Sequence, residues 1–253
     1  MQLLISCAKT MSEHPACPTP RTTAPAFGEV ARTLAARLAA LSADDLAGLL
    51  HVNRTLAAEN RRRYTRFHDH GSEAAAAIVS YTGVVFRYID PESFSDEDFE
   101  FAQRHLHITS FLYGLLRPLD AIQPYRLEGN VPIPGEERTP FELWPGHLTE
   151  PLLDAVREDD GVLVNLASAE MKRLFDWRRL QREVRIITPE FRIREGGRLR
   201  TVVVYTKMCR GAMTRYLLRN RIAEPERLKA FEWEGFRYDA AESRGDRWLF
   251  TLG

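Results

Sequence analysis

The sequence of 253 residues has little cysteine, little lysine and no long apolar run. Its three cysteines, Cys7, Cys17 and Cys209, are odd in number and far apart, which argues against a disulfide framework. No apolar stretch approaches the roughly 20 residues of a membrane helix, and the first residues lack the basic flank of a signal peptide. We therefore expect a soluble, cytoplasmic, reduced protein with no membrane partner.

The sequence also has no net charge, because its 35 basic residues equal its 35 acidic residues in number. This balance excludes a basic nucleic-acid footprint over the whole surface. The charges are nevertheless segregated: residues 171–227 carry 16 Lys or Arg against 6 Asp or Glu, whereas residues 89–100 carry six acidic side chains and no basic one. This segregation indicates one face that attracts anions, and solvated faces that cancel in the folded protein are the alternative.

The spacing of apolar residues predicts an α/β fold of mixed α+β type. Helical periodicity is found at residues 28–41, 53–67, 95–105, 148–156 and 208–221. Strands are predicted at residues 3–5, 83–88, 108–112, 162–166, 185–188, 191–194, 199–205, 236–238 and 248–251, with a hairpin at Gly196 and Gly197. Residues 12–27 hold four prolines and predict a loop. We expect a single compact domain over residues 1–253, with a mixed central sheet flanked by helices.

Polar side chains follow three of the predicted strands, at the positions where α/β sheets collect ligands. These side chains are Ser6, Lys9, Thr10, Asn165, Ser168, Thr206, Lys207 and Arg210. If the strands are parallel neighbours, their ends meet in one cleft, where Lys9, Lys207 and Arg210 favour an anion such as phosphate. The alternative is that the strands are not adjacent and the three clusters lie apart.

Arg117 and Arg126 form a second basic cluster, beside prolines that restrict the backbone. A stiffly held guanidinium can clamp a phosphate through two hydrogen bonds. Tyr113, which precedes Arg117 by four residues, would stack on a base or donate a hydrogen bond. The alternative is that Asp120 is only a structural partner for Arg117.

Metal and thiol chemistry have weaker support. His68 with His70 and His105 with His107 resemble metal pairs, but their spacing suits a strand and no cysteine or carboxylate has ligand spacing. We therefore expect no metal and no cofactor. Cys7 stands two residues from Lys9, which would lower the pKa of a reactive thiol, and an inert small residue is the alternative.

Several motifs, in order over nearly the whole chain, resemble the YaaA peroxide-stress family. They are Ser6-Cys-Ala-Lys-Thr10, Tyr113-Gly-Leu-Leu-Arg-Pro-Leu-Asp120, Pro124-Tyr-Arg-Leu-Glu128, Asn165-Leu-Ala-Ser168, Lys207 with Arg210-Gly211, Asn220-Arg221 and Glu234-Gly-Phe-Arg-Tyr-Asp239. The resemblance implies a mixed α/β domain with a positively charged cleft and a helix-hairpin-helix-like element, which we place at residues 28–67. It also implies binding to duplex or branched DNA and protection from peroxide damage involving iron.

The chain departs from the family pattern at two positions. Cys7 stands where the family usually has proline, and Val84 stands where it has aspartate. The loss of this aspartate removes a candidate acid or base from the cleft. Either the chain keeps DNA binding despite the changes, or it is a specialised paralogue that acts on a small ligand.

These patterns support two hypotheses about function, and a scaffold or regulatory protein with no ligand in the cleft is a third. In the first, a basic cleft binds DNA through phosphates. The residues of this cleft are Ser6, Thr10, Tyr113, Arg117, Arg126, Asn165, Ser168, Lys207 and Arg210, together with Lys9. In the second, an enzyme acts on a nucleotide, nucleobase or similar small anion in the same cleft. Lys9 or Lys207 is then the base or nucleophile, because a lysine desolvated beside other cations has a lowered pKa.

Overall fold

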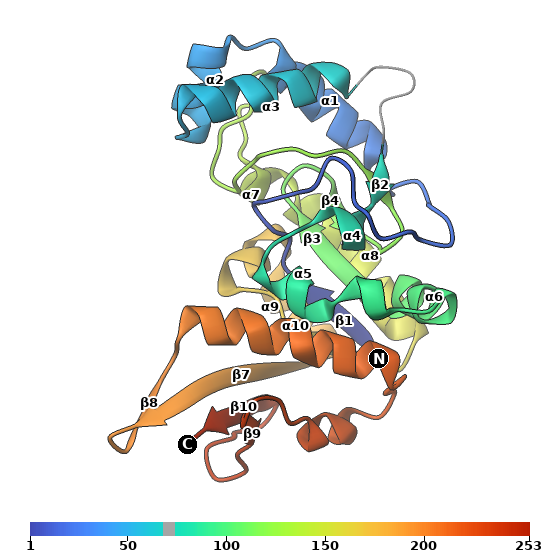
Figure 1. The fold of residues 1–253 in the computed structure, drawn as a ribbon, viewed down its shortest axis with the longest axis vertical. Helices are drawn as coiled ribbons and strands as arrows, with labels where there is room; N and C mark the ends of the chain where they lie inside the picture. The colour runs from blue at the N-terminus through green and yellow to red at the C-terminus, as the bar shows by residue number, and fades with distance from the viewer. Residues whose placement is uncertain (68–73) are drawn as a thin grey trace.

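The computed structural model describes residues 1–67 and 74–253, and an eight-stranded mixed sheet forms its centre (Figure 1). Along the sheet the strands are β4 (Gly114–Leu116), β3 (Leu106–Ser110), β1 (Gln2–Ile5), β6 (Val162–Asn165), β7 (Arg185–Glu195), β10 (Arg247–Leu252) and β9 (Arg237–Tyr238), with β8 (Arg198–Arg200) paired to β7. The five strands from β3 to β10 are parallel, whereas β4, β8 and β9 are antiparallel to their neighbours. The predicted mixed sheet is confirmed.

Helices cover both faces of the sheet. Figure 1 shows α5 (Val84–Ile89), α6 (Asp96–His105) and α10 (Val203–Arg219) in front of it, and α8 (Pro145–Glu158) and α9 (Trp177–Glu183) behind it. Because both faces are covered, the central strand β1 is buried throughout, which explains its apolar sequence. Within the described residues, no helix is both long enough and apolar enough to cross a bilayer.

Three further helices form a layer beyond the sheet, at the top of Figure 1: α1 (Gly28–Ala39), α2 (Ala43–Leu50) and α3 (Arg54–Arg66). The Ser42 and Asn53 side chains cap α2 and α3 by accepting from backbone N–H groups. Shorter elements complete the chain. They are β2 (Ala75–Ala76), α4 (Ala77–Ser80), η1 (Pro91–Ser93), β5 (Ala121–Ile122), α7 (Pro140–Leu143), η2 (Ala169–Leu174) and η3 (Pro225–Ala230).

Two sequence expectations about local structure are wrong. The strand predicted over residues 199–205 ends early, because β8 ends at Arg200 and α10 begins at Val203. The strand predicted over residues 83–88 is instead the helix α5, which spans Val84–Ile89. Valine-rich stretches favour strands by propensity, but here the packing of α5 against α10 overrides that preference. Gly211 permits this packing, since a Cβ there would collide with the Val85 carbonyl oxygen. The predicted hairpin between β7 and β8 is confirmed.

Candidate anion site at the strand ends

The carboxyl ends of β1, β3 and β6 lie side by side at one edge of the sheet. Leu4 of β1 is aligned with Asn165 of β6 and with His107 of β3. Just beyond the strand ends, the Ser168 amide donates to Ser6 Oγ at 2.8 Å, and the two hydroxyl oxygens are 3.3 Å apart. The structure therefore brings Ser6 of the first predicted cluster next to Ser168 of the second, because their strands are parallel neighbours.

A pocket of about 210 Å³, which we call the strand-end pocket, lies between β6, β7, η2 and the first turns of α10. Its polar lining consists of Asn165, Lys172, Thr188, Glu190, Thr201, Thr206 and Arg210. Thr206 and Arg210, from the third predicted cluster, thus reach the same edge, although they are carried by a helix and not by a strand end.

Two buried donors in the strand-end pocket have no partner among the described residues. Asn165 is 1% exposed, and its Oδ1 accepts the Ala167 amide at 3.2 Å, but its Nδ2 donates to no described acceptor. Nε of Arg210 is also buried and unpartnered. Burial lowers the pKa of Arg210, while the Glu190 carboxylate acts in the opposite direction. A buried N–H without an acceptor costs about 1–3 kcal/mol, so the pocket suits a ligand rich in acceptors.

Lys9 lies in a separate polar cluster beyond β1. Its Nζ is 3.0 Å from Oε1 of Glu128, which also accepts from Nη2 of Arg126 at 3.1 Å. The Lys9 side chain is 67% exposed, so burial does not desolvate it as the enzyme hypothesis requires. Nε of Arg126 is buried without a partner among the described residues, and Thr10 is exposed. Lys9 and Arg126 are therefore close together on an ion-paired surface.

A chain of buried hydroxyl groups lies behind this cluster. Tyr125 OH is 2.7 Å from Ser110 Oγ and 3.0 Å from Tyr81 OH.

Burial and the nearby Glu128 carboxylate raise the pKa of the Cys7 thiol to about 12. The expected lowering of the Cys7 pKa is therefore wrong, because desolvation outweighs any attraction by the exposed Lys9, and the thiol stays protonated.

Neither Arg117 nor Tyr113 lines the strand-end pocket. Tyr113 follows the carboxyl end of β3, where its amide donates to Ser110 Oγ at 2.9 Å, whereas Arg117 lies toward the other end of the strands. Nη1 of Arg117 donates to Oε1 of Gln2 at 3.4 Å, and Gln2 is at the opposite end of β1 from the strand-end pocket. The Asp120 carboxylate accepts a hydrogen bond from the Arg117 backbone amide at 2.8 Å. Asp120 is therefore a structural partner of Arg117, which was the alternative interpretation of the sequence. Tyr113 is 3% exposed and its OH accepts the Gln123 amide, so its ring offers no free face for a base.

Lys207 is exposed on α10, one turn before Arg210, and forms no ion pair with the described residues. Lys9 and Lys207 therefore belong to different elements: Lys9 lies in the loop that follows β1, and Lys207 lies in α10.

Of the predicted histidine pairs, His68 and His70 lie outside the described residues. Among the described residues, no group of three His, Cys, Asp or Glu side chains is arranged to hold a metal.

The two departures from the family pattern lie near each other. A Cβ on Gly83, the residue before Val84, would come within 2.7 Å of the Ala8 Cβ, and Ala8 directly follows Cys7. Val84 therefore begins α5 beside the loop that leaves β1. The lost aspartate at this position would have stood close to the Ser6–Thr10 segment.

Sequence reasoning missed several polar residues of this edge: Tyr81, Ser110, Tyr125, Glu128, Lys172, Thr188 and Glu190. Lys172 had a usable signal, because it is one of only four lysines and closely follows Ser168. Glu190 lies inside a long strand, and only the position of α10 brings it to the pocket.

These features define a class: a mixed α/β protein with a polar pocket at the carboxyl ends of parallel strands. The family model described as "Peroxide stress protein YaaA" matches residues 1–242, and the chain belongs to this family. It is similar to UPF0246 proteins of Bacteroides fragilis (51% identical over 255 residues), Bacteroides thetaiotaomicron (48% over 254) and Porphyromonas gingivalis (42% over 256). Each match covers 100% of this chain and at least 99% of the relative.

Proposed function

We propose that this protein binds DNA through backbone phosphates, one of which enters the strand-end pocket. The unpartnered donors of Asn165 and Arg210 carry this proposal, because a phosphate oxygen would satisfy both. Lys172 adds a positive charge to the pocket wall. Glu190 already has two partners, Arg192 at 2.9 Å and Arg247 at 2.5 Å, so its charge is compensated.

The start of α10 supports an anion at the same place. Its N-cap is Val202, which has no side chain able to accept from the first backbone N–H groups. Thr206, in the first turn of this 17-residue helix, lines the pocket. Unsatisfied N–H groups and the helix dipole favour negative charge at such an end.

Further phosphates would contact two other basic surfaces. Lys9 and Arg126 form the nearer one, where Glu128 now compensates their charge. The second is α3, whose exposed arginines are Arg54, Arg61, Arg62 and Arg66. We assign α2, α3 and the turn at His51 to the DNA-facing helix-hairpin-helix-like element. Because the basic side chains are gathered in local patches, the protein can bind phosphates although its net charge is zero. A uniformly basic surface would require a positive net charge.

The salt dependence of DNA binding tests this proposal. Each phosphate contact releases counterions, so Lys207→Ala and Arg210→Ala should each shallow the log–log salt slope by about one unit on a short duplex. Arg182→Ala, an exposed arginine on α9 outside the pocket, is the matched control and should leave the slope unchanged. An unchanged slope for Arg210→Ala would remove the strand-end pocket from the phosphate contacts, and an unchanged slope for Lys207→Ala would remove this exposed lysine of α10.

The size of the strand-end pocket favours a second candidate, an enzyme acting on a small anion. About 210 Å³ holds a phosphate or a small substrate but not a duplex, which would contact only its mouth. Lys172 is then the lysine that lines the pocket, with its Nζ 5.0 Å from the centroid of the Trp177 ring, whereas Lys9 is exposed and paired. Thermal stabilisation by a mononucleotide, abolished by Arg210→Ala, would favour the enzyme over DNA binding.

A further inference from the structure

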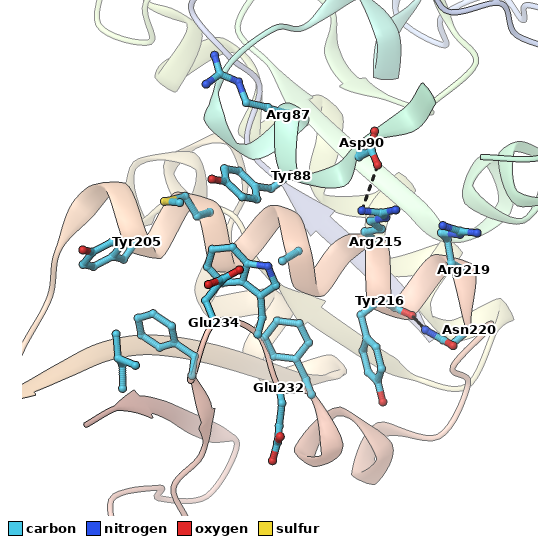
Figure 2. Close-up of a pocket in the computed structure, with 16 residues that line it drawn as sticks. Arg87, Tyr88, Asp90, Tyr205, Arg215, Tyr216, Arg219, Asn220, Glu232 and Glu234 are labelled. Carbon is cyan, nitrogen blue, oxygen red and sulfur yellow. Dashed lines mark hydrogen bonds and ion pairs between the residues drawn. The ribbon is translucent and has the colours of Figure 1, made fainter. Parts of the chain in front are cut away.

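A second and larger hollow, which we call the α10 groove, lies along the other side of α10. It has a volume of about 1070 Å³ and is bounded by α5, α10 and the segment 231–236 (Figure 2). Thr206 and Arg210 of α10 face the strand-end pocket, while Tyr205, Met208 and Ala212 line the groove. The helix therefore separates two hollows, and nothing in the function proposed above occupies the groove.

One end of the α10 groove is aromatic. The rings of Tyr88 and Trp233 meet edge to face with centroids 5.2 Å apart, and Tyr205 lies edge to face with Phe236 at 6.2 Å. Tyr205 remains 40% exposed, one of three large apolar side chains in the described residues that are so exposed. Aromatic groups left open to solvent in a hollow are platforms on which a planar ligand can stack.

A tight turn fixes the aromatic end. Trp233 and Phe236 exchange both backbone hydrogen bonds, at 3.1 and 2.8 Å, across a two-residue hairpin. The two turn residues, Glu234 and Gly235, have φ angles of 47° and 82°, as the hairpin geometry requires. Trp233 is thus held in place before any ligand arrives, which reduces the entropy lost on binding.

The opposite end of the α10 groove is cationic. Figure 2 shows Arg215 and Arg219 toward the end of α10, whereas Arg87 lies beside Tyr88 on the facing helix, away from these two arginines. Arg215 pairs with Asp90 at 3.1 Å, Arg219 lies 3.9 Å from Asp98, and Arg87 forms no ion pair with the described residues. The Arg215–Asp90 pair is exposed, and such pairs contribute only about 0–1 kcal/mol, so an anionic ligand can replace the Asp90 carboxylate at little cost. Arg219 is at 3.9 Å only loosely paired with the largely buried Asp98.

We propose that the α10 groove binds a nucleotide, with its base on Tyr205 and Trp233 and its phosphates at Arg215 and Arg219. Tyr205 and Arg215 are ten residues apart, or about 15 Å along a helix, which suits a nucleoside diphosphate or a short single strand. Glu232 and Glu234, exposed beside the turn, repel phosphate from the aromatic end and so fix the ligand's direction. This site is separate from the strand-end pocket and does not depend on DNA binding there.

Isothermal titration of the full chain with ADP, a tetranucleotide single strand and inorganic phosphate tests the proposal. Tyr205→Ala should weaken ADP binding about tenfold, because stacking on one aromatic ring contributes that much, and Arg219→Ala should weaken it about three- to tenfold. Val203→Ala, the neighbouring exposed position outside the groove, is the matched control. Binding of ADP identifies a free nucleotide as a ligand, and binding of the single strand alone identifies a nucleic-acid segment.

Three results would overturn the nucleotide site. They are no binding of ADP or the single strand, binding that Tyr205→Ala and Arg219→Ala leave unchanged, and inorganic phosphate binding as tightly as ADP. Arg210→Ala separates this proposal from DNA binding at the strand ends, since it should weaken duplex binding and leave ADP binding in the α10 groove intact. Loss of ADP binding in Arg210→Ala with retention in Tyr205→Ala would assign the nucleotide to the strand-end pocket instead.

Discussion

The strand-end pocket and the α10 groove share one helix but differ in nearly every physical property. The pocket is small and holds buried donors without acceptors, whereas the groove is five times larger in volume and holds exposed rings and arginines that already have carboxylate partners. Successive residues on a helix point about 100° apart, so Tyr205 and Thr206 serve different hollows although they are neighbours in sequence.

Because of these different properties, the strand-end pocket and the α10 groove should select their ligands in different ways. In the strand-end pocket, the buried donors of Asn165 and Arg210 have no acceptor among the described residues, so selectivity comes from a ligand whose few acceptors match them. In the α10 groove, no buried side-chain donor is left unpaired among the described lining residues, and affinity must come from stacking and from exchange of weak surface ion pairs. The two regions should therefore respond differently to single substitutions.

The largest expected effect is that of Asn165→Asp on the strand-end pocket. Aspartate has the same shape and keeps the oxygen that accepts the Ala167 amide, but it replaces the unpartnered N–H donor by negative charge. A buried charge facing an anion should reduce duplex affinity more than tenfold. Fluorescence anisotropy with a labelled duplex measures this change.

Titration of the same variant with ADP sharpens the comparison. Asn165 does not line the α10 groove, so nucleotide binding there should be unchanged. A circular dichroism melt checks that Asn165→Asp is folded at the assay temperature. An Asn165→Asp protein that is folded and binds duplex as well as the parent would separate the strand-end pocket from DNA binding.

The sequence predicted the two regions unequally, for physical reasons. The buried strands and the Ser6, Asn165 and Ser168 positions follow from local apolar runs and from the rule for parallel strand ends, and the structure brings these residues together. The α10 groove could not be predicted, because it exists only where Tyr88, Tyr205 and Trp233 meet from three distant segments. The helical state of residues 203–205 also depends on tertiary packing rather than on local propensity.

The next effect concerns the pH dependence of stability near the strand ends. In the folded state the pKa of Cys7 is raised from 9.0 to about 12, mainly by burial. Between these pH values the unfolded thiol has lost its proton and the folded thiol has kept it, so stability falls as pH rises, by up to about 1.4 kcal/mol per pH unit. Cys7→Ala removes this contribution, and its stability should fall less between pH 9 and pH 11.

Urea unfolding of the parent chain, Cys7→Ala and Cys17→Ala at each pH measures the difference. Cys17 is the control because it is only partly buried, and its pKa is raised by that partial burial and by the Glu92 carboxylate. Differences between variants cancel the alkaline contribution of Cys209, whose pKa is also raised by burial. The Cys7 thiolate adds to the rise in the pKa values of the buried Tyr81 and Tyr125, so Cys7→Ala also reduces their alkaline contribution, which changes the stability in the same direction. Parallel stability curves for the parent and Cys7→Ala would show that the thiol is not desolvated and that this edge is more open than described.

The smallest expected effect is a gain of function in the α10 groove. Asp90→Asn removes the carboxylate that pairs with Arg215 at 3.1 Å, and asparagine tolerates the left-handed backbone at this position, where φ is 53°. Because the exposed pair contributes less than about 1 kcal/mol, stability should change little, while Arg215 becomes available to phosphate. ADP affinity should rise about threefold and duplex affinity at the strand ends should not change. Weaker ADP binding in this variant would mean that Asp90 positions Arg215 rather than competing with the ligand, and the two regions would then differ less than their contacts indicate.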